Sequence, residues 1–385
     1  ETAERIKTEI GDDVAFVVRF SIATFDSSAI GVEDGLEFIA AHDDLVDLWN
    51  LNVGTEAEWH KDSGPSRGFE QGYQMEWVGR AKEVAKKPVL GVSRFTDPDL
   101  MAKLVEEGKI DIVGAARPSI ADPYLPRKVE EGRLDEIREC IGCNICIKGS
   151  LGDGHMKCTQ NPTAGEEFRR GWDPEAVPPS ARPDRDALVI GGGPAGMECA
   201  MVLAKRGLRA VHLVEGEKEL GGAMRWIPRL PHLGEWGRVV NYRDIQLQKL
   251  KQVQVIRGQR LDAAQARDYG ADLIVVATGS SWADDGSTFM TNGRLEGADA
   301  SQPHVLTPEQ IMVEGKEPPG KRVVVYDTDG YFMGPGLAEL LASRGHEVEL
   351  LTPYAAPAQI CVATTEAPVV YEQLHSAGVS VVANH

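Results

Sequence analysis

Ala187-Leu-Val-Ile190-Gly191-Gly-Gly193-Pro-Ala-Gly196 is a short apolar run followed at once by glycines with G-x-G-x-x-G spacing. The next residues predict a helix over Met197–Arg206 and a strand over Ala210–Val214, which ends at an acid nineteen residues beyond the last glycine. Strand, glycine turn, helix, strand and terminal acid form the dinucleotide-binding Rossmann fingerprint, with the pyrophosphate at the helix N-terminus and the acid on a ribose hydroxyl. A structural glycine turn is the alternative. The residues assigned to this ADP or FAD site are Gly191, Gly193, Gly196 and Glu215.

Two later segments repeat parts of this pattern. Asp272–Ala277 predicts a buried strand that runs into Thr278 and Gly279, where backbone can again approach a nucleotide. A second βαβ unit and a last strand are predicted over Arg322–Tyr326, Gly336–Arg344, Glu347–Leu351 and Val379–Val382. Its glycine positions are replaced by Asp327, Asp329 and Phe332. These side chains would collide with a pyrophosphate and the two carboxylates would repel it, so we expect the βαβ shape without the phosphate cradle.

The N-terminal third alternates short apolar runs with helical stretches. The predicted strands are Val14–Ser21, Val46–Gly54, Pro88–Arg94 and Asp111–Arg117, and the predicted helices include Val32–His42, Tyr73–Ala85 and Asp97–Glu107. Right-handed crossovers make such strands parallel, and four βα units are half of a (β/α)8 barrel. The first residues predict a helix with no preceding strand, so we expect the chain to begin mid-domain.

The ends of these strands carry candidate flavin ligands. Arg19, Arg94 and Arg117 lie near strand ends, where functional residues of such barrels collect. In the last two, Gly91-Val-Ser93-Arg94 and Gly114-Ala-Ala116-Arg117, small residues let backbone N–H groups approach a phosphate while arginine supplies charge. We therefore expect FMN here. The alternative is that the arginines pair with acidic residues of the barrel rim.

Four of the six cysteines fall within nineteen positions, in Cys140-Ile-Gly142-Cys143-Asn-Ile-Cys146 and at Cys158. Three thiols at successive x2 spacing, with Gly142 relieving the turn, and a fourth from a loop are typical of [4Fe–4S] ligation. A zinc site more often shows two separated C-x2-C pairs, so zinc is the lesser alternative, and unligated thiols are a third. Cys199 and Cys361 are interpreted as plain buried thiols.

Composition narrows the class of partner. A net charge of −18 with no Lys/Arg run argues against nucleic acid and anionic membrane, and no apolar run is long enough to span a bilayer. Clustered cysteines favour a reducing compartment, so we expect a cytoplasmic protein.

The predicted divisions are 1–136 for the second half of an FMN-binding TIM barrel, 137–172 for a [4Fe–4S] segment, 173–183 for a Pro-rich linker, 184–320 for an ADP/FAD-binding Rossmann-like domain and 321–385 for an incomplete second unit. The expected fold class is accordingly α/β.

Trp59 and Asp62 follow the second predicted strand and could set an aromatic wall and an acid beside one pocket. From the residues alone, a solvated tryptophan and a loop carboxylate are the simpler interpretation.

The order of flavin barrel, cluster and nucleotide domain resembles the iron–sulfur flavoproteins that include trimethylamine, dimethylamine and histamine dehydrogenases and 2,4-dienoyl-CoA reductase. The resemblance covers nearly the whole chain. It is most specific in Gly114–Pro123, Cys140–Cys146, Cys158-Thr-Gln-Asn-Pro, Ala164–Trp172 and Leu233-Gly-Glu-Trp236. It implies that Arg19 and Arg117 contact FMN, that the four cysteines hold [4Fe–4S], and that Gly191 to Glu215 hold ADP or FAD. It also implies that Trp59 is a substrate-cage tryptophan and Asp62 the acid of a Tyr-His-Asp triad.

Three departures bear on function. The family's first half barrel, with its covalent FMN cysteine and the triad Tyr and His, is absent, so we expect this chain to be inactive alone. A second cage tryptophan is replaced near Ser150, which favours a larger or more polar amine such as histamine over a small methylamine. The changes at Asp327 to Phe332 are similar to the amine dehydrogenases rather than the reductases.

The prediction is therefore a homodimeric amine dehydrogenase that passes electrons from FMN through [4Fe–4S] to an electron-transferring flavoprotein. An NAD(P)H-dependent enoate or dienoyl-CoA reductase and a non-catalytic electron-transfer or nucleotide-binding fragment are the alternatives.

Overall fold

The computed structural model describes residues 1–11, 13–26, 29–149, 154–288, 290 and 293–385. Its contacts divide the chain into two compact units. The first is Glu1–Asn161 with Thr364–Glu366, and the second is Pro162–Ala363 with Ala367–His385. A three-residue segment from late in the sequence therefore belongs to the first unit.

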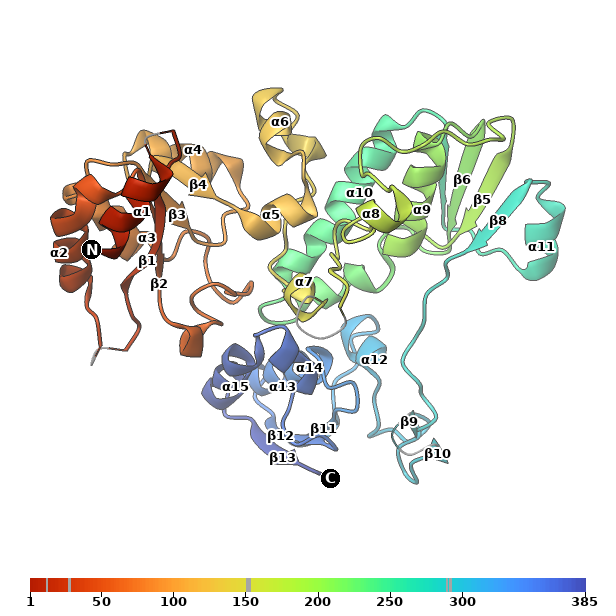
Figure 1. The fold of residues 1–385 in the computed structure, drawn as a ribbon. Helices are drawn as coiled ribbons and strands as arrows, with labels where there is room; N and C mark the ends of the chain where they lie inside the picture. The colour runs from red at the N-terminus through yellow and green to blue at the C-terminus, as the bar shows by residue number, and fades with distance from the viewer. Residues whose placement is uncertain (12, 27–28, 150–153, 289, 291–292) are drawn as a thin grey trace. The chain divides into compact units, whose positions relative to one another are not determined.

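The first unit is built on a four-stranded parallel sheet in the order β1-β2-β3-β4 (Figure 1). Its strands are β1 (Val17–Ala23), β2 (Leu48–Val53), β3 (Val89–Val92) and β4 (Ile112–Gly114). Its α-helices are α1 (Thr2–Ile10), α2 (Val32–His42), α3 (Met75–Val78), α4 (Pro98–Glu106), α5 (Ala116–Ala121), α6 (Leu125–Glu130) and α7 (Ile145–Lys148). Sequential parallel strands with helices between them confirm the predicted succession of βα units.

α2 shows why the helices can cover this sheet closely. Ile39 on its apolar face is fully buried. A Cβ on Gly35 would lie 2.0 Å from the carbonyl oxygen of Ile22, so only glycine permits this approach of helix to strand. The core beneath it includes Ile22, Ile39, Trp49, Leu51 and Val89.

Two predictions for this unit were wrong in detail. The helix expected over Tyr73–Ala85 is the short α3 followed by a 3-10 helix over Gly79–Glu83, because the glycine at the junction disfavours a continuing α-helix. The strand expected over Asp111–Arg117 ends at Gly114, and Ala116 and Arg117 instead open α5. Pro118 explains the change, because proline fits the first turn of a helix but not the interior of a sheet.

The second unit contains two parallel sheets, in the orders β7-β6-β5-β8 and β11-β12-β13. Its strands are β5 (Asp186–Ile190), β6 (Ala210–Glu215), β7 (Val253–Arg257), β8 (Leu273–Val276), β9 (Ser287–Thr288), β10 (Gly293–Arg294), β11 (Arg322–Tyr326), β12 (Glu347–Thr352) and β13 (Ser380–Ala383). Its α-helices are α8 (Glu167–Arg170), α9 (Pro194–Lys205), α10 (Arg238–Lys249), α11 (Ala263–Asp268), α12 (Pro308–Met312), α13 (Met333–Ser343), α14 (Gln359–Ala363) and α15 (Ala367–Ser376). Both predicted βαβ units are present.

Three expectations for the second unit need correction. α9 and α13 each begin three residues earlier than predicted, so the last glycine of the fingerprint lies in the first helical turn. The strand β8 was expected to be buried, yet Val276 is 70% exposed. It pairs only with β5 at one end of the sheet, which leaves its outer side uncovered within the described residues.

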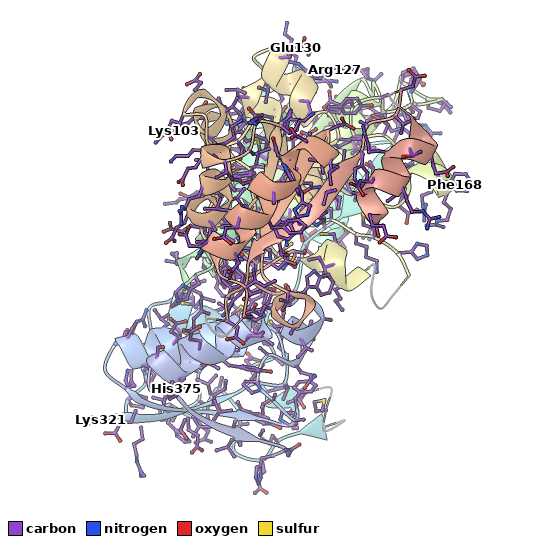
Figure 2. The ribbon with its side chains drawn as sticks, turned by 60° about the vertical axis from the view of Figure 1, so that its left-hand side comes forward. Lys103, Arg127, Glu130, Phe168, Lys321 and His375 are labelled. Atoms are coloured by element: carbon purple, nitrogen blue, oxygen red, sulfur yellow. The ribbon has the colours of Figure 1, made fainter. Side chains whose placement is uncertain are left out.

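The polar segment at residues 173–183 contains no helix or strand, but it is attached to α9. Ser180 N–H donates to the Arg206 carbonyl at 2.8 Å, and Lys205 Nζ donates to the Pro174 carbonyl at 3.3 Å. Charged side chains such as Lys103, Arg127 and Glu130 project outward from the helices of the first unit (Figure 2). Among the residues described, no helix has the length and apolar character needed to cross a membrane.

Candidate cofactor and substrate sites

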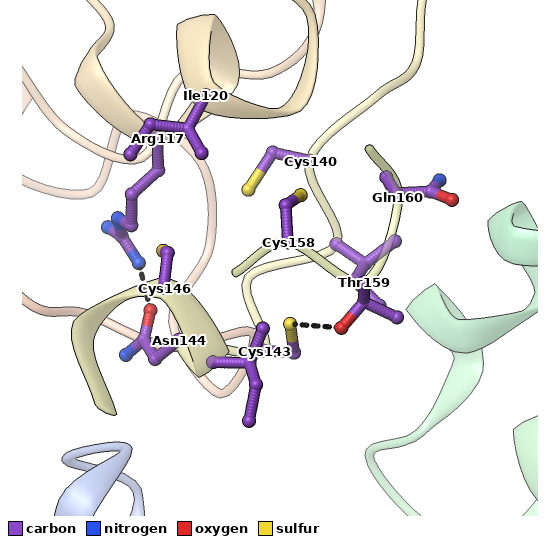
Figure 3. A pocket seen from close by; sticks show the side chains of 11 residues that line it. Arg117, Ile120, Cys140, Cys143, Asn144, Cys146, Cys158, Thr159 and Gln160 are labelled. Carbon is purple, nitrogen blue, oxygen red and sulfur yellow. Dashed lines mark hydrogen bonds between the residues drawn. The ribbon is translucent and has the colours of Figure 1, made fainter. Parts of the chain in front are cut away.

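Four thiols line one cavity of the first unit (Figure 3). They belong to Cys140, Cys143, Cys146 and Cys158, and Arg117 contributes to the same wall. The structure thus brings together the four residues that the spacing predicted as ligands. The other two cysteines lie elsewhere, Cys361 buried and Cys199 half-buried.

Two left-handed residues between the thiols shape this loop. Gly142 has φ 64°, and a Cβ there would lie 2.8 Å from Arg94 Nη1 and 2.9 Å from the backbone nitrogen of Arg67. Asn144 has φ 54°, a conformation that asparagine tolerates better than most residues. The chain can therefore reverse twice within a few residues and direct successive cysteines at one cavity.

Burial makes the thiols of Cys143, Cys146 and Cys158 poor acids on their own. It raises the pKa of Cys143 to about 12 and that of Cys158 to about 11, and it also raises the pKa of Cys146. The Thr159 hydroxyl, 3.2 Å from Cys143 Sγ, lowers the pKa of Cys143. The charge of Arg117 lowers the pKa of Cys146. Buried thiols of this kind become thiolates when a metal centre displaces their protons.

The four thiols are a candidate metal site because of their chemistry and the cavity that they share. Four cysteine thiolates are the usual ligand set of a [4Fe–4S] cluster. In the part of the chain that the structure describes, no group of three or more His, Cys, Asp or Glu side chains is arranged as a site for a metal ion. The expectation of iron–sulfur ligation therefore rests on the donor set and its spacing.

Arg117 and Asn144 connect this cavity to the loop after β2. Arg117 Nη1 donates to the Pro65 carbonyl at 2.6 Å and to Asn144 Oδ1 (Figure 3). Asn144 is 2% exposed, and its Nδ2 donates to the Gly64 carbonyl at 2.7 Å. The sequence interpretation missed Asn144, although an asparagine between two closely spaced ligands is a signal for a left-handed turn.

Of the other predicted FMN residues, Ser93, Arg94 and Ala116 follow the C-terminal ends of β3 and β4 in the same sheet. The strand-end position expected for Arg19 was wrong, because β1 continues to Ala23 and Arg19 is its third residue. Ser93 is buried, and its Oγ accepts the Gln74 N–H at 2.9 Å. Arg94 is buried with φ 51°, and Ala116 is exposed at the start of α5. Arg19 is exposed, and its Nη1 donates to Asn50 Oδ1 at 3.0 Å. Arg19 and Arg117 therefore bond to neutral oxygens rather than to rim carboxylates, which leaves their charge available to a phosphate.

Asp62 is held by neighbours that the sequence interpretation did not single out. Asn52 Nδ2 donates to Asp62 Oδ1 and, at 3.1 Å, to Ser21 Oγ. Gln74, fully buried, donates from Nε2 to the Asp62 carbonyl at 2.9 Å. Trp59 is half-buried on the same loop. A polar side chain on an apolar strand, as at Asn52, was the available signal.

Tyr73 lies close to this group. Gln74 Nε2 donates to its hydroxyl at 3.0 Å, and burial raises the pKa of Tyr73 to about 12. The charge of Asp62 acts in the same direction. The phenol therefore stays protonated at neutral pH beside the candidate acid.

In the second unit, the glycine fingerprint leaves room at the N-terminus of α9. A Cβ on Gly191 would lie 2.3 Å from the Ala277 carbonyl oxygen, and one on Gly196 would lie 1.9 Å from the Gly191 carbonyl oxygen. A Cβ on Gly193 would meet nothing within 4 Å, which is where a ligand can approach. The exposed Thr278 and Gly279 follow β8 beside this turn.

Glu215 closes the same turn from the end of β6. Its Oε2 accepts the Gly192 N–H at 2.6 Å and its Oε1 accepts the Glu217 N–H at 2.8 Å. Both oxygens keep further acceptor capacity, as ribose binding requires.

Asp327 fills the corresponding position of the second βαβ unit. Its Oδ1 accepts the N–H groups of Asp329 at 3.1 Å and Gly330 at 3.0 Å. A Cβ on Gly334, in the first turn of α13, would lie 2.4 Å from Asp327 Cγ. Burial raises the pKa of Asp327 to about 6. The carboxyl group thus occupies the space where a pyrophosphate would meet this helix.

Three family models match successive parts of the chain. Residues 1–136 match the NADH:flavin oxidoreductase / NADH oxidase family, residues 144–281 match pyridine nucleotide-disulphide oxidoreductases, and residues 306–385 match the OYE-like second alpha/beta domain. Dimethylamine dehydrogenase of Hyphomicrobium sp. (strain x) is 46% identical over 361 residues, which are 91% of this chain and 48% of that protein. The chain is similar to flavin-dependent oxidoreductases that act on amines.

Solved structures of similar proteins show the same fold. 6-Hydroxypseudooxynicotine amine oxidase from Pseudomonas geniculata N1 matches with a TM-score of 0.93 at 42% identity, covering 100% of this chain and 56% of that one. Histamine dehydrogenase from Rhizobium sp. 4-9 matches with a TM-score of 0.90 at 39% identity, covering 99% of this chain and 55% of that one. The chain therefore spans about half the length of these relatives. The predicted fold class, part of an FMN-binding TIM barrel followed by Rossmann-like domains, is confirmed.

Proposed function

We propose that this chain is part of an iron–sulfur flavoprotein that oxidises an amine. When bound, FMN would take two electrons from the α-carbon–hydrogen bond of the amine, and a [4Fe–4S] cluster would pass them singly to an acceptor. The imine product would then be hydrolysed to an aldehyde, with release of ammonia from a primary amine or of a smaller amine from an N-alkylated one. The single observation that carries the proposal is that Arg117, a predicted FMN contact, lines the cavity of the four cysteines.

Some residues of the first unit would bind the flavin, and others would bind the amine and orient a base. Arg19, Ser93, Arg94, Ala116 and Arg117 would hold the flavin phosphate and ring. Asp62, with its carboxylate held by Asn52 and Ser63, would orient a base for the substrate proton. Trp59 would supply an aromatic wall for the cationic amine. ADP or FAD would bind between Gly191 and Glu215.

The Asp327 carboxyl favours this function over an NAD(P)H-dependent reductase. A reductase of this architecture needs a phosphate cradle in its second nucleotide unit, and here an internal acid occupies that position. Nicotinamide binding at the first fingerprint would be the remaining route for the alternative.

The substrate and the acceptor are further parts of the proposal. Histamine dehydrogenase and dimethylamine dehydrogenase among the relatives support a histamine-like or methylated amine. The expected replacement near Ser150, which favours a larger amine, lies outside the described residues. An electron-transferring flavoprotein would accept the electrons, in a homodimeric enzyme located in the cytoplasm.

Anaerobic spectral titration of the full-length protein tests these points together. We expect an amine such as histamine or dimethylamine to bleach the flavin, and NADPH and NADH to leave it oxidised over the same time. Reduction by a nicotinamide at a catalytic rate would overturn the proposal. If neither the amine nor a nicotinamide bleaches the flavin, a non-catalytic electron-transfer protein is favoured. Cys158→Ser is the control for the absorbance of the cluster, because loss of one cysteine ligand should lower the iron content.

A further inference from the structure

Asn144 joins three parts of the first unit through one side chain. Its Nδ2 donates to the Gly64 carbonyl at 2.7 Å, to the Thr364 carbonyl at 3.0 Å and to Thr365 Oγ1 at 3.0 Å, while its Oδ1 accepts from Arg117. Thr365 Oγ1 donates in turn to the Gly64 carbonyl at 2.9 Å. A buried amide whose oxygen and nitrogen are both engaged has a single well-defined orientation.

That orientation fixes the guanidinium of Arg117. Its Nη1 is shared between Asn144 Oδ1 and the Pro65 carbonyl, so the charge is held against the wall of the cysteine cavity. Asn144 lies between two of the thiols in sequence and directly follows Cys143. The same side chain therefore positions both the loop of the cysteines and the cation that faces it (Figure 3).

We propose that Asn144 is a positioning residue that sets the redox potential of the cluster through Arg117, an inference that rests on the proposed function. Each electron that enters a four-thiolate cluster adds one negative charge, and a fixed guanidinium beside it stabilises that charge. A guanidinium released into other rotamers stabilises it less. By fixing Arg117, Asn144 would favour electron flow from a bound flavin to a bound cluster.

Asn144→Gly is the direct test, because glycine adopts the left-handed backbone freely and removes only the carboxamide. In the full-length holoenzyme, an EPR-monitored redox titration of the cluster is expected to give a lower midpoint potential than in the wild type. Stopped flow after mixing with amine is expected to show a slower transfer of electrons from flavin to cluster than in the wild type. An unchanged potential would overturn the inference.

Asn161→Gly is the matched control. Asn161 is a buried amide three residues after Cys158, and its Nδ2 donates to the Ile120 carbonyl at 3.0 Å. Loss of this amide loosens the neighbourhood of the cluster without touching the contact between Asn144 and Arg117. A shift in this variant as large as that of Asn144→Gly would mean that any loosening suffices, and would also overturn the inference.

A double-mutant cycle with Arg117→Gln tests the route through arginine. If Asn144 acts through Arg117, Asn144→Gly adds no further shift in potential once the guanidinium is gone, whereas additive shifts contradict the inference. If Asn144→Gly retains less iron than the wild type, Thr365→Val replaces it as the test. This variant removes one hydrogen-bond partner of the Asn144 amide, and it is expected to lower the midpoint potential of the cluster by a smaller amount. An iron-free wild-type protein would instead refute the proposed function itself.

Discussion

Arg67 and Glu366 form an ion pair that is buried on both sides, with side-chain exposures of 6% and 2%, although 299 positions separate them in the chain. Glu366 Oε2 also accepts the Thr364 hydroxyl at 2.7 Å. The Arg67 backbone N–H donates to the Gly142 carbonyl at 3.0 Å, so the pair lies beside the cysteine loop. A late segment of the sequence is thus part of the structure that supports the four thiols.

Glu366→Gln is expected to lower the free energy of unfolding by about 3–5 kcal/mol, because it leaves the buried Arg67 guanidinium without a countercharge. Chemical denaturation followed by far-UV circular dichroism measures the change. Glu347→Gln, which removes an exposed pair with Lys321, is the control and should lower the free energy of unfolding far less. Equal effects of the two substitutions would show that the burial of the first pair has no energetic consequence.

Asp327→Asn should change how stability depends on pH. Burial raises the pKa of Asp327 to about 6 from its usual 3.8, so the native state holds this proton more tightly than the unfolded chain does. Its contribution to stability is complete below about pH 4 and is lost as the pH rises through about 6. The neutral amide removes this loss, so the variant should be more stable than wild type at pH 7.5, by at most about 3 kcal/mol, and similar at pH 4.

Thermal unfolding of Asp327→Asn at several pH values measures this effect. Asp285→Asn is a control for which the opposite change in stability is expected. Hydrogen bonds from Ser287 lower the pKa of Asp285, so its carboxylate stabilises the native state at neutral pH, and the variant should be less stable than wild type there. A pH dependence of Asp327→Asn parallel to that of wild type would contradict the assignment.

Asp62→Asn is expected to reduce kcat for amine oxidation by about 100-fold or more, since an amide cannot orient and charge-stabilise a base as a carboxylate does. KM should change much less, because the loop remains pinned by Gln74 through backbone carbonyls. Steady-state kinetics of the full-length enzyme provides the measurement. Lys61→Met, on the same loop, is the control, and a loss of activity as large as that of Asp62→Asn would assign the effect to loop geometry.

Gly193→Ala and Gly196→Ala should separate nucleotide binding from folding. A Cβ at Gly193 meets no atom of the chain, so Gly193→Ala should keep its thermal stability and release less adenine nucleotide on denaturation. A Cβ at Gly196 would collide with backbone, so Gly196→Ala should lose both. Gly234→Ala, whose Cβ also meets nothing, is the control expected to change neither. Normal nucleotide content in Gly193→Ala would mean that no ligand approaches this turn.

Local patterns in the sequence were enough for the parts of the fold that repeat every few residues. The apolar runs placed β1 to β6, and the spacing of Cys140 to Cys158 placed four thiols at one cavity. The same patterns could not predict which strand lies at the edge of a sheet, so the exposure of Val276 was missed. They also could not reveal that Thr364 and Thr365 meet Asn144, because such contacts depend on the path of the whole chain.

The outer side of β8 has a practical consequence for handling the protein. Leu273 and Ile274 are 39% and 38% exposed, Val276 is 70% exposed, and the strand carries no charged residue between them. An uncovered apolar strand edge is a template for pairing with another molecule. We therefore expect the outer edge of β8 to pair with other molecules when this chain is prepared alone, and Val276→Lys to lower aggregation, measured by light scattering, by adding charge at the most exposed position.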